Sequence, residues 1–256
     1  MLLSVIIPAY NERLTLGPIL AIVVRSLPTV SKEIIVIDDC SEDGTREWLR
    51  VNFPEGERQG STVDLDRDGN LAFGEVTGAP RVTIRPIYHE RNKGKGGALQ
   101  TGFAAFSGHA LVIQDADLEY DPTDWERMYD LIAVRKVADA VFGSRFYGRP
   151  HRSLYFHHYL ANRLISFLFN VIYNQTLTDI EACYKMMTSS VARSLHLTAN
   201  DFSIEVEICA KIARQRKLRI YELGISYFGR TYAEGKKITW KDGMKALWCV
   251  FKFRFK

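Results

Sequence analysis

Short apolar runs alternate with segments of helical spacing along the first half of the chain. The runs consist mostly of Val, Ile, Leu and Ala, which is typical of strands buried on both faces of a parallel sheet. They lie at residues 3–7, 33–37, 82–88, 110–113 and 138–143. Apolar residues at helical spacing predict helices at residues 15–26, 43–51, 94–106 and 124–134. This order predicts an α/β fold with a doubly wound layer.

Two stretches depart from this alternation. Residues 52–80 are rich in Gly, Asp, Glu and Arg, and we expect a surface insertion there. After Gly148 the pattern becomes more aromatic and predicts helices at residues 154–173, 203–214 and 242–253, with a strand at 219–227. We therefore expect one domain over residues 1–256 that carries the insertion and two helical elements, at about 154–173 and 240–256.

Composition narrows the class of protein only slightly. The chain has 256 residues, of which 46% are hydrophobic. Its net charge of +4 permits anionic partners, but we do not expect nucleic acid to be one of them. Its four cysteines are scattered without a CxxC pair, so we expect reduced thiols in a cytosolic compartment. The chain starts directly on an apolar run without a basic segment, which favours a first strand over a signal peptide. The sequence contains no run of 18 uncharged apolar residues, so we expect no membrane-spanning helix.

Polar clusters follow three of the predicted strands. They are Tyr10-Asn11-Glu12, Asp38-Asp39 and Asp115-Ala116-Asp117. In open α/β sheets, ligands bind beyond the carboxyl ends of the strands. In QDADLEYDP, at residues 114–122, four carboxylates fall at alternate positions and repel one another unless a cation lies among them. A magnesium ion shared with the diphosphate of a nucleotide would relieve this repulsion. The alternative is a solvated turn in which Asp121 and Pro122 cap the next helix.

Six motifs in a fixed order carry a family resemblance. They are SVIIPAYNE, VIDDCSEDGT, NKGKGGAL, QDADLEYDP, FGSRF and TDIEACYK. Together they resemble the family 2 glycosyltransferases, in particular the branch of dolichyl-phosphate mannose synthase-like and polyprenyl-phosphate glycosyltransferases. The resemblance runs from Ser4 to about Phe253, and the insertion at residues 52–80 departs from it. It implies a GT-A fold, which is a Rossmann-like, mainly parallel mixed sheet flanked by helices, here with C-terminal amphipathic helices.

The resemblance also implies roles for matching residues. Pro8, Tyr10 and Glu12 would surround the base and ribose of a nucleotide sugar, and Asp39 would bind the uracil or guanine. Further donor contacts are implied for Lys93, Asp115, Arg230, Lys236 and Lys237. The implied ligands of a magnesium or manganese ion are Asp115, Asp117 and Glu119. Asp117 and Arg145 would act in catalysis.

The expected chemistry requires positive charge at the leaving group. Cleavage of a sugar–diphosphate bond leaves negative charge on the departing phosphate, which a metal ion and Arg or Lys side chains stabilise. Candidates are Arg145, Arg230, Lys236 and Lys237. Residues 230–238, RTYAEGKKI, resemble the mobile basic loop that closes over the donor in this family. The alternative is a solvated basic loop.

The acceptor determines whether a general base is needed. A sugar hydroxyl must lose a proton to attack, whereas a lipid phosphate, with a second pKa of about 6, is already largely ionised. The stretch at residues 200–207 lacks the Glu-Asp base motif that many hydroxyl-directed members carry. Asp201 could be a catalytic base, but its place after Asn200 favours a helix N-cap.

We therefore expect an inverting, metal-dependent glycosyltransferase that moves a sugar from a UDP- or GDP-linked donor to a polyprenyl phosphate. Three alternatives remain. They are transfer to a lipid or saccharide hydroxyl, a non-catalytic module that binds nucleotide sugars or membranes, and a nucleotidyltransferase that releases pyrophosphate.

Two hydrophobic helical stretches have Lys or Arg beside aromatic residues. In residues 154–169, aromatic side chains gather on one side. Residues 240–256 mix aromatic with basic residues: Trp248, Phe251, Phe253 and Phe255 lie among Lys245, Lys252, Arg254 and Lys256. Such faces suit helices that lie in the lipid headgroup layer, so we expect peripheral contact with the cytoplasmic face of a membrane. The alternatives are core packing and a homodimer contact.

A second acidic loop matches the twelve-residue calcium loop at its ligand positions. The candidate ligands are Asp64, Asp66, Asp68 and Glu75. The flanking residues do not predict the entering and leaving helices of an EF-hand. A separate structural calcium site and a plain solvated loop are both open.

Overall fold

The structure of the chain is a computed structural model. It describes residues 1–60, 63–66, 71–74, 80–148, 150–153, 155–231 and 240–255. The strands are β1 (Leu2–Ala9), β2 (Ser31–Asp38), β3 (Arg58–Gly60), β4 (Val63–Leu65), β5 (Leu71–Phe73), β6 (Val82–Tyr88), β7 (Ala110–Ile113), β8 (Ala140–Ser144), β9 (Lys185–Thr188) and β10 (Ile220–Gly224). The longer helices are α1 (Leu16–Arg25), α2 (Thr45–Asn52), α3 (Gly94–Ala105), α5 (Phe156–Tyr173), α7 (Ile204–Ala213) and α8 (Trp240–Phe255). Shorter ones are η1 (Pro122–Asp124), α4 (Trp125–Tyr129), η2 (Asp130–Val134) and α6 (Ser189–Ser194).

One large sheet organises the molecule, with strand order β10-β8-β9-β7-β1-β2-β6-β3. All its pairings are parallel except those of β9 with β7 and β8 and of β3 with β6. The mixed, mainly parallel α/β sheet predicted from the sequence is confirmed. The strands β3, β4, β5 and β9 and the short helix α6 were not predicted.

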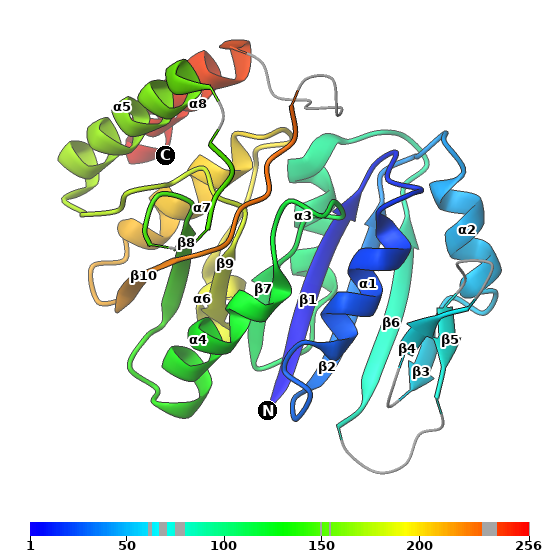
Figure 1. Cartoon of the computed structure of the whole chain (residues 1–256). Helices are drawn as coiled ribbons and strands as arrows, with labels where there is room; N and C mark the ends of the chain where they lie inside the picture. Colours follow the sequence, from blue (N-terminus) through cyan, green and yellow to red (C-terminus); the bar gives the residue numbers. More distant parts are fainter. Residues whose placement is uncertain are drawn as a thin grey trace.

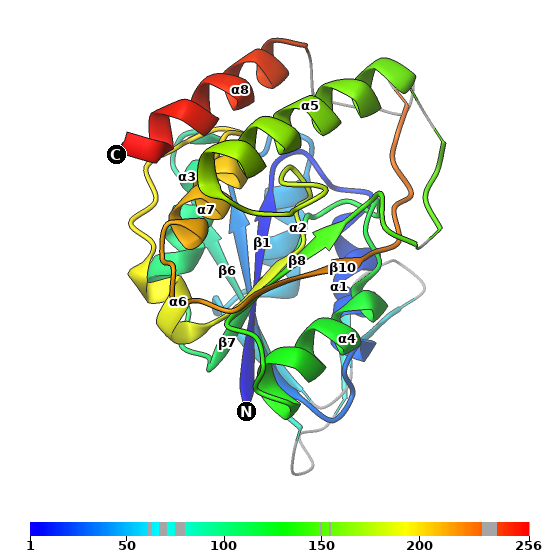
Figure 2. The same cartoon turned by 90° about the vertical axis from the view of Figure 1, so that its left-hand side faces the viewer.

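Helices cover both faces of the sheet. In Figure 2 the sheet is seen near its edge, with α3, α6 and α7 on one side and α1 and α4 on the other. Helices α5 and α8 pack against each other at the end of the molecule toward which β1 runs (Figure 1). The apolar runs of the central strands are buried; Val5, Ile6 and Ile113 are each 0% exposed. Removal of this apolar surface from water is the main favourable contribution to folding.

The predicted insertion contains regular structure. After α2 the chain adds β3 to the edge of the sheet and then forms a two-stranded antiparallel hairpin of β4 and β5. The backbone N–H of Leu71 donates to Oδ1 of Asn52 at 2.7 Å, which ties the hairpin to the end of α2. Of the candidate calcium ligands, Asp68 and Glu75 lie outside the described residues, so that site remains a prediction.

Glycines let the start of α3 approach a second segment closely. A Cβ atom at Gly96 would lie 2.1 Å from the carbonyl oxygen of Ala199, and one at Gly94 would lie 2.3 Å from that of Asn200. Gly94 also has φ +77°, a conformation that other residues rarely adopt. The N–H of Gly96 donates to the carbonyl of Asn200 at 2.8 Å. The NKGKGG motif therefore joins α3 to the loop before α7.

Candidate active site

A hollow of about 130 Å³ lies at the carboxyl ends of β1, β2 and β7. Its polar lining brings together residues far apart in the sequence: Tyr10, Glu12, Asp39, Lys95, Asp115, Asp117 and Arg230. Pro8, Ala9, Ala98, Ala116 and Phe202 complete the wall. The three polar clusters that follow predicted strands thus meet in one place. Four carboxylates and two cations face a single space there.

Asp39 anchors the segment that leads into α3. Its carboxylate accepts the backbone N–H groups of Lys93 and Gly94 at 2.8 and 2.7 Å, and it lies 2.7 Å from Nδ1 of His89. Asp39 is 2% exposed, so these partners satisfy a carboxylate that has almost no access to water. The Lys93 side chain is exposed and is not part of the lining. What Lys93 contributes in this structure is its backbone N–H.

Lys95, which the sequence interpretation did not single out, lies inside the hollow. Its Nζ is 2.7 Å from Oδ1 of Asp115 and 3.0 Å from Oε1 of Glu205. Lys185 pairs with the other oxygen of Glu205 at 2.5 Å. Burial opposes the charge of Lys95, but Asp115 and the other negative neighbours hold its pKa well above the ordinary value. A fixed positive charge therefore stands beside Asp115.

The carboxylates of Asp115, Asp117 and Glu119 form what we call the acidic edge. Arg230 pairs with the side of this edge opposite Lys95. Its guanidinium donates to Asp117 and to Glu119, each at 2.8 Å, and lies 3.8 Å from a carboxylate oxygen of Glu12. Glu119 also accepts the hydroxyl of Tyr227 at 2.9 Å and the backbone N–H of Arg230 at 3.2 Å. Glu119 therefore fastens residues 227–230 to the acidic turn after β7.

Asp117 retains an excess of negative charge around it. Burial raises the pKa of Asp117 to about 7, and the charges of Asp115 and Glu119 add to this shift against the opposing charge of Arg230. Among the residues that the structure describes, no group of three or more His, Cys, Asp or Glu side chains could hold a metal ion by itself. Asp121 is not part of this edge, because its side chain caps η1 by accepting the N–H of Thr123 at 2.9 Å.

Arg145 lies outside the lining of the hollow. It forms a bidentate ion pair with the fully buried Asp179, in which Nε and Nη2 donate to the two carboxylate oxygens at 2.7 and 2.9 Å. The guanidinium carbon also lies 5.2 Å from the ring centre of Tyr227. Its contact with a phosphate stays a prediction. Lys236 and Lys237 of the expected basic loop are not among the described residues.

Each carboxylate of the candidate base stretch already has partners. Asp201 pairs with Lys245 and accepts the N–H of Ser203 at 3.0 Å, and Ser203, not Asp201, holds the N-cap position of α7. Burial alone would raise the pKa of Asp201, but hydrogen bonds from Lys245 and Ser203 lower it. Glu207 accepts hydrogen bonds from Thr198 and from the N–H of Ala199. The pKa of Glu207 is lowered as well, so neither Asp201 nor Glu207 has the raised pKa expected of a general base.

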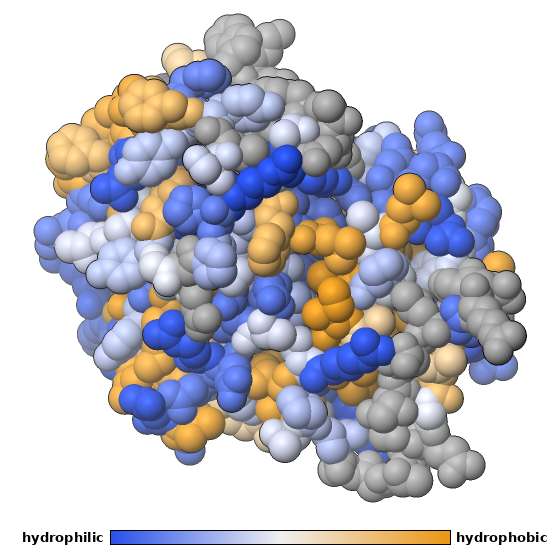
Figure 3. Space-filling view, viewed as in Figure 1, coloured by the Kyte–Doolittle hydropathy of each residue, from blue (hydrophilic) through white to orange (hydrophobic). Residues whose placement is uncertain are grey.

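The amphipathic helices α5 and α8 share one exposed apolar face. Their inner sides are buried, and the hydroxyl of Tyr173 on α5 donates to the carbonyl of Val250 on α8 at 2.9 Å. The outer sides form what we call the apolar surface: Phe156, Tyr159, Leu160, Leu164, Phe167, Val171, Met244, Trp248, Phe251 and Phe255. Figure 3 shows hydrophobic residues gathered at its upper left, over these two helices. Across the described residues, every helix is too short or too polar to cross a membrane.

Comparison with known proteins agrees with the resemblance seen in the sequence. The family model described as Glycosyl transferase family 2 matches residues 4–59 and 80–195. The gap in this match falls within the predicted insertion. A dolichyl-phosphate beta-glucosyltransferase from Dictyostelium discoideum is 28% identical, over 92% of this chain and 68% of its own length. A dolichol-phosphate mannosyltransferase from Pyrococcus furiosus is 24% identical, over 93% of this chain and 61% of its own.

Two further comparisons concern a shorter relative and the fold. An undecaprenyl-phosphate mannosyltransferase from Micrococcus luteus is 25% identical, over 90% of this chain and 85% of its own length. Glucosyl-3-phosphoglycerate synthase from Mycobacterium tuberculosis, solved in complex with Mn²⁺, UDP and glucosyl-3-phosphoglycerate, superposes with a TM-score of 0.67. The superposed region covers 99% of this chain and 80% of the synthase chain, and the two sequences are 17% identical. The expected GT-A fold is confirmed.

Proposed function

The chain belongs to glycosyl transferase family 2, and we propose that it transfers a sugar from a nucleoside-diphosphate donor to a polyprenyl phosphate at a membrane surface. The observation that carries this proposal is the set of carboxylates and cations in one hollow at the carboxyl edge of the sheet. The relatives named for dolichyl, dolichol and undecaprenyl phosphates support a lipid phosphate as the acceptor.

A divalent cation fits the residues of the hollow. Asp115 and Asp117 offer the oxygen ligands that Mg²⁺ and Mn²⁺ prefer, and the remaining ligands would come from the donor diphosphate and water. The raised pKa of Asp117 indicates that Arg230 does not fully balance the acidic edge. When bound, the ion would stabilise negative charge on the departing diphosphate. Glu119 contributes mainly by anchoring Arg230.

Protein side chains supply the rest of the positive charge. Lys95 lies in the hollow beside Asp115, and Arg230 lies beside Asp117. Both cations are held in place before the donor arrives, so little reorganisation is needed when charge develops on the leaving group. Tyr10 is 38% exposed at the rim, where a nucleoside base could stack on its ring.

The pairing of the carboxylates near α7 with basic side chains supports a phosphate acceptor. Asp201 has a lowered pKa, and Glu205 lies between Lys95 and Lys185. A hydroxyl acceptor would need one of them as a base with a pKa near neutrality. A lipid phosphate is already an anion and attacks without such a base. The apolar surface lies at the same end of the molecule as the hollow, where a lipid acceptor would be presented (Figure 1).

Donor binding tests the site directly. Calorimetry with UDP- and GDP-sugars, with and without Mg²⁺ or Mn²⁺, should show metal-dependent binding to one donor class. Asp115→Asn and Asp117→Asn should each weaken that binding at least roughly tenfold, as expected for loss of a charged ligand. Asp130→Asn, which removes a carboxylate paired with Arg135 at 2.6 Å away from the hollow, is the matched control. Equal binding by all four proteins would disprove the assignment of the hollow.

Turnover distinguishes the acceptor classes. With the bound donor and a polyprenyl phosphate, the enzyme should release a nucleoside diphosphate, and Asp201→Asn should remain active. Loss of turnover in Asp201→Asn with donor binding intact would instead support a hydroxyl acceptor. Release of pyrophosphate would identify a nucleotidyltransferase.

A further inference from the structure

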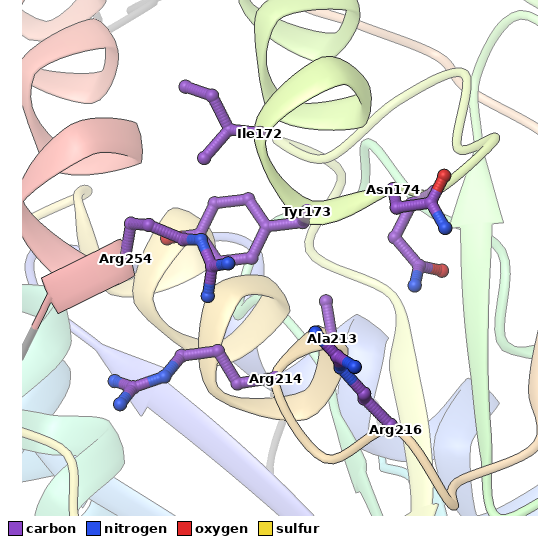
Figure 4. Close-up of a pocket in the computed structure, with 8 residues that line it drawn as sticks. Ile172, Tyr173, Asn174, Ala213, Arg214, Arg216 and Arg254 are labelled. Atoms are coloured by element: carbon purple, nitrogen blue, oxygen red, sulfur yellow. The ribbon is translucent and has the colours of Figure 1, made fainter.

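A larger hollow of about 430 Å³ lies where three helices end. Its walls are the last residues of α5 and those that follow, the end of α7 with Arg216, and Arg254 near the end of α8. Figure 4 shows side chains from these three helix ends around Tyr173. The full lining is Ile172, Tyr173, Asn174, Gln175, Ala213, Arg214, Arg216 and Arg254. None of these residues belongs to the candidate active site.

The lining of this basic hollow contains three arginines and no acidic residue. Arg214 donates to the carbonyl of Phe253 at 3.2 Å, and the guanidinium of Arg254 lies 5.9 Å from the ring centre of Tyr173. In the part of the chain that the structure describes, no ion pair is recorded for Arg214, Arg216 or Arg254. Most of their hydrogen-bond donors are therefore available to a ligand. Asn174 and Gln175 add amide groups.

This hollow borders the apolar surface. Its lining residue Ile172 follows Val171, which is 66% exposed, and Arg254 precedes Phe255, which is 88% exposed. Phe251 lies one turn before Phe255 on the same face of α8. Aromatic side chains that enter the headgroup layer would hold the arginines at the depth of the lipid phosphates. Guanidinium groups suit phosphate because they donate two parallel hydrogen bonds to it.

We propose that the basic hollow binds the phosphate of an anionic phospholipid headgroup while the apolar surface rests on the membrane. The inference builds on the membrane contact in the proposed function and adds a lipid site separate from the acceptor. A membrane lipid is favoured over a soluble phosphate compound because the hollow opens beside exposed aromatic residues. A soluble ligand would not require that position. The site would fix how the enzyme is oriented on the membrane.

Vesicle flotation tests the proposal with the full chain. Binding to vesicles of phosphatidylcholine alone is compared with binding to vesicles that also contain phosphatidylglycerol. The wild type should prefer the anionic vesicles, and Arg216→Gln/Arg254→Gln should reduce that preference roughly tenfold or more, since each cation near an anionic surface contributes to binding. Arg50→Gln/Arg135→Gln removes the same charge from α2 and from the end of η2, and should keep the preference. Transfer activity in detergent, expected within about twofold of wild type, confirms folding.

The outcomes separate this proposal from the function on which it rests. If Arg216→Gln/Arg254→Gln keeps the full preference for anionic vesicles, the headgroup site is disproved and the membrane contact stands. If the wild type binds neither kind of vesicle, both the contact and the site are disproved, whereas donor binding is unaffected. A calorimetric titration with inorganic phosphate adds one arm. Phosphate binding that the double variant loses, without any vesicle preference, would assign the hollow to a soluble phosphate compound and overturn the lipid assignment.

Discussion

At the scale of single residues, Glu181 links pH to stability. It lies two residues after the buried Asp179 and accepts a hydrogen bond from Nδ2 of Asn162 at 2.8 Å. Burial raises the pKa of Glu181 from 4.5 to about 7, although Arg145 opposes the shift. Between these two values the native state binds more protons than the unfolded state. The free energy of unfolding therefore falls as the pH rises through this window.

Glu181→Gln should remove this loss, because glutamine can still accept from Asn162 and carries no charge. Relative to wild type, the variant should gain on the order of 2 kcal/mol in unfolding free energy between about pH 5 and pH 8. Urea denaturation at several pH values measures the difference. Glu126→Gln, an exposed glutamate on α4, is the control and should run parallel to wild type. A parallel curve for Glu181→Gln as well would show that Glu181 does not titrate as described.

Some residues of the candidate active site could be predicted from the sequence, and others could not. Tyr10, Glu12, Asp39, Asp115 and Asp117 follow strands of a parallel sheet, so the fold rule alone placed them together. Lys95 was missed because Lys93 in the same motif has the same side chain, and which of them faces the hollow depends on where α3 begins. The partner of Arg145 could not be read either. Asp179 is far from it in sequence, and only the pairing of β8 with its neighbours brings the two together.

At the scale of elements, the first turn of α3 is predicted to depend on Gly96. Gly96→Ala would place a Cβ atom 2.1 Å from a backbone carbonyl oxygen, which cannot move aside as a flexible side chain would. We expect a loss of about 2–4 kcal/mol in unfolding free energy and weaker donor binding, because the neighbouring Lys95 would shift. Urea denaturation and calorimetry measure the two effects.

Gly243→Ala is the matched control for Gly96→Ala. Gly243 lies in α8 with no atom within 4 Å of an added Cβ, so the change should be neutral or stabilise by up to about 1 kcal/mol. If both variants behave alike, the close approach between α3 and residues 199–200 is not a constraint on the fold.

Elements were predicted best where their pattern is local. All five strands β1, β2, β6, β7 and β8 were predicted. The runs of β1, β2, β7 and β8 are mostly apolar because both faces of these strands are largely buried, whereas burial alternates along β6. Strand β9 was missed because its four residues, KMMT, contain no β-branched run and follow a turn-rich segment. It is stabilised by antiparallel pairing with β7 and β8 on either side, which no window of sequence reports.

At the scale of the whole molecule, the hollow and the apolar surface occupy the same end. Strand β1 runs toward the end where α5 and α8 lie, and its carboxyl end forms part of the hollow (Figures 1 and 2). A chain that rests on a membrane through these helices would therefore hold its acidic edge close to the lipid phosphates. The arrangement predicts that membrane contact matters for a long-chain acceptor and not for the chemistry itself.

Phe167→Ser/Trp248→Ser should separate these two roles. The side chains are 61% and 64% exposed, so their loss should leave the fold intact but remove about 3 kcal/mol or more of apolar contact with the membrane. Transfer to a polyprenyl phosphate in vesicles should fall at least tenfold, while transfer to a short, water-soluble isoprenyl phosphate stays within about twofold. Val51→Ser/Val134→Ser removes equally exposed apolar side chains, 67% and 66%, from other surfaces and should change neither activity. Equal losses with both acceptors would place Phe167 and Trp248 in the support of the site, and unchanged activity in vesicles would exclude the membrane contact.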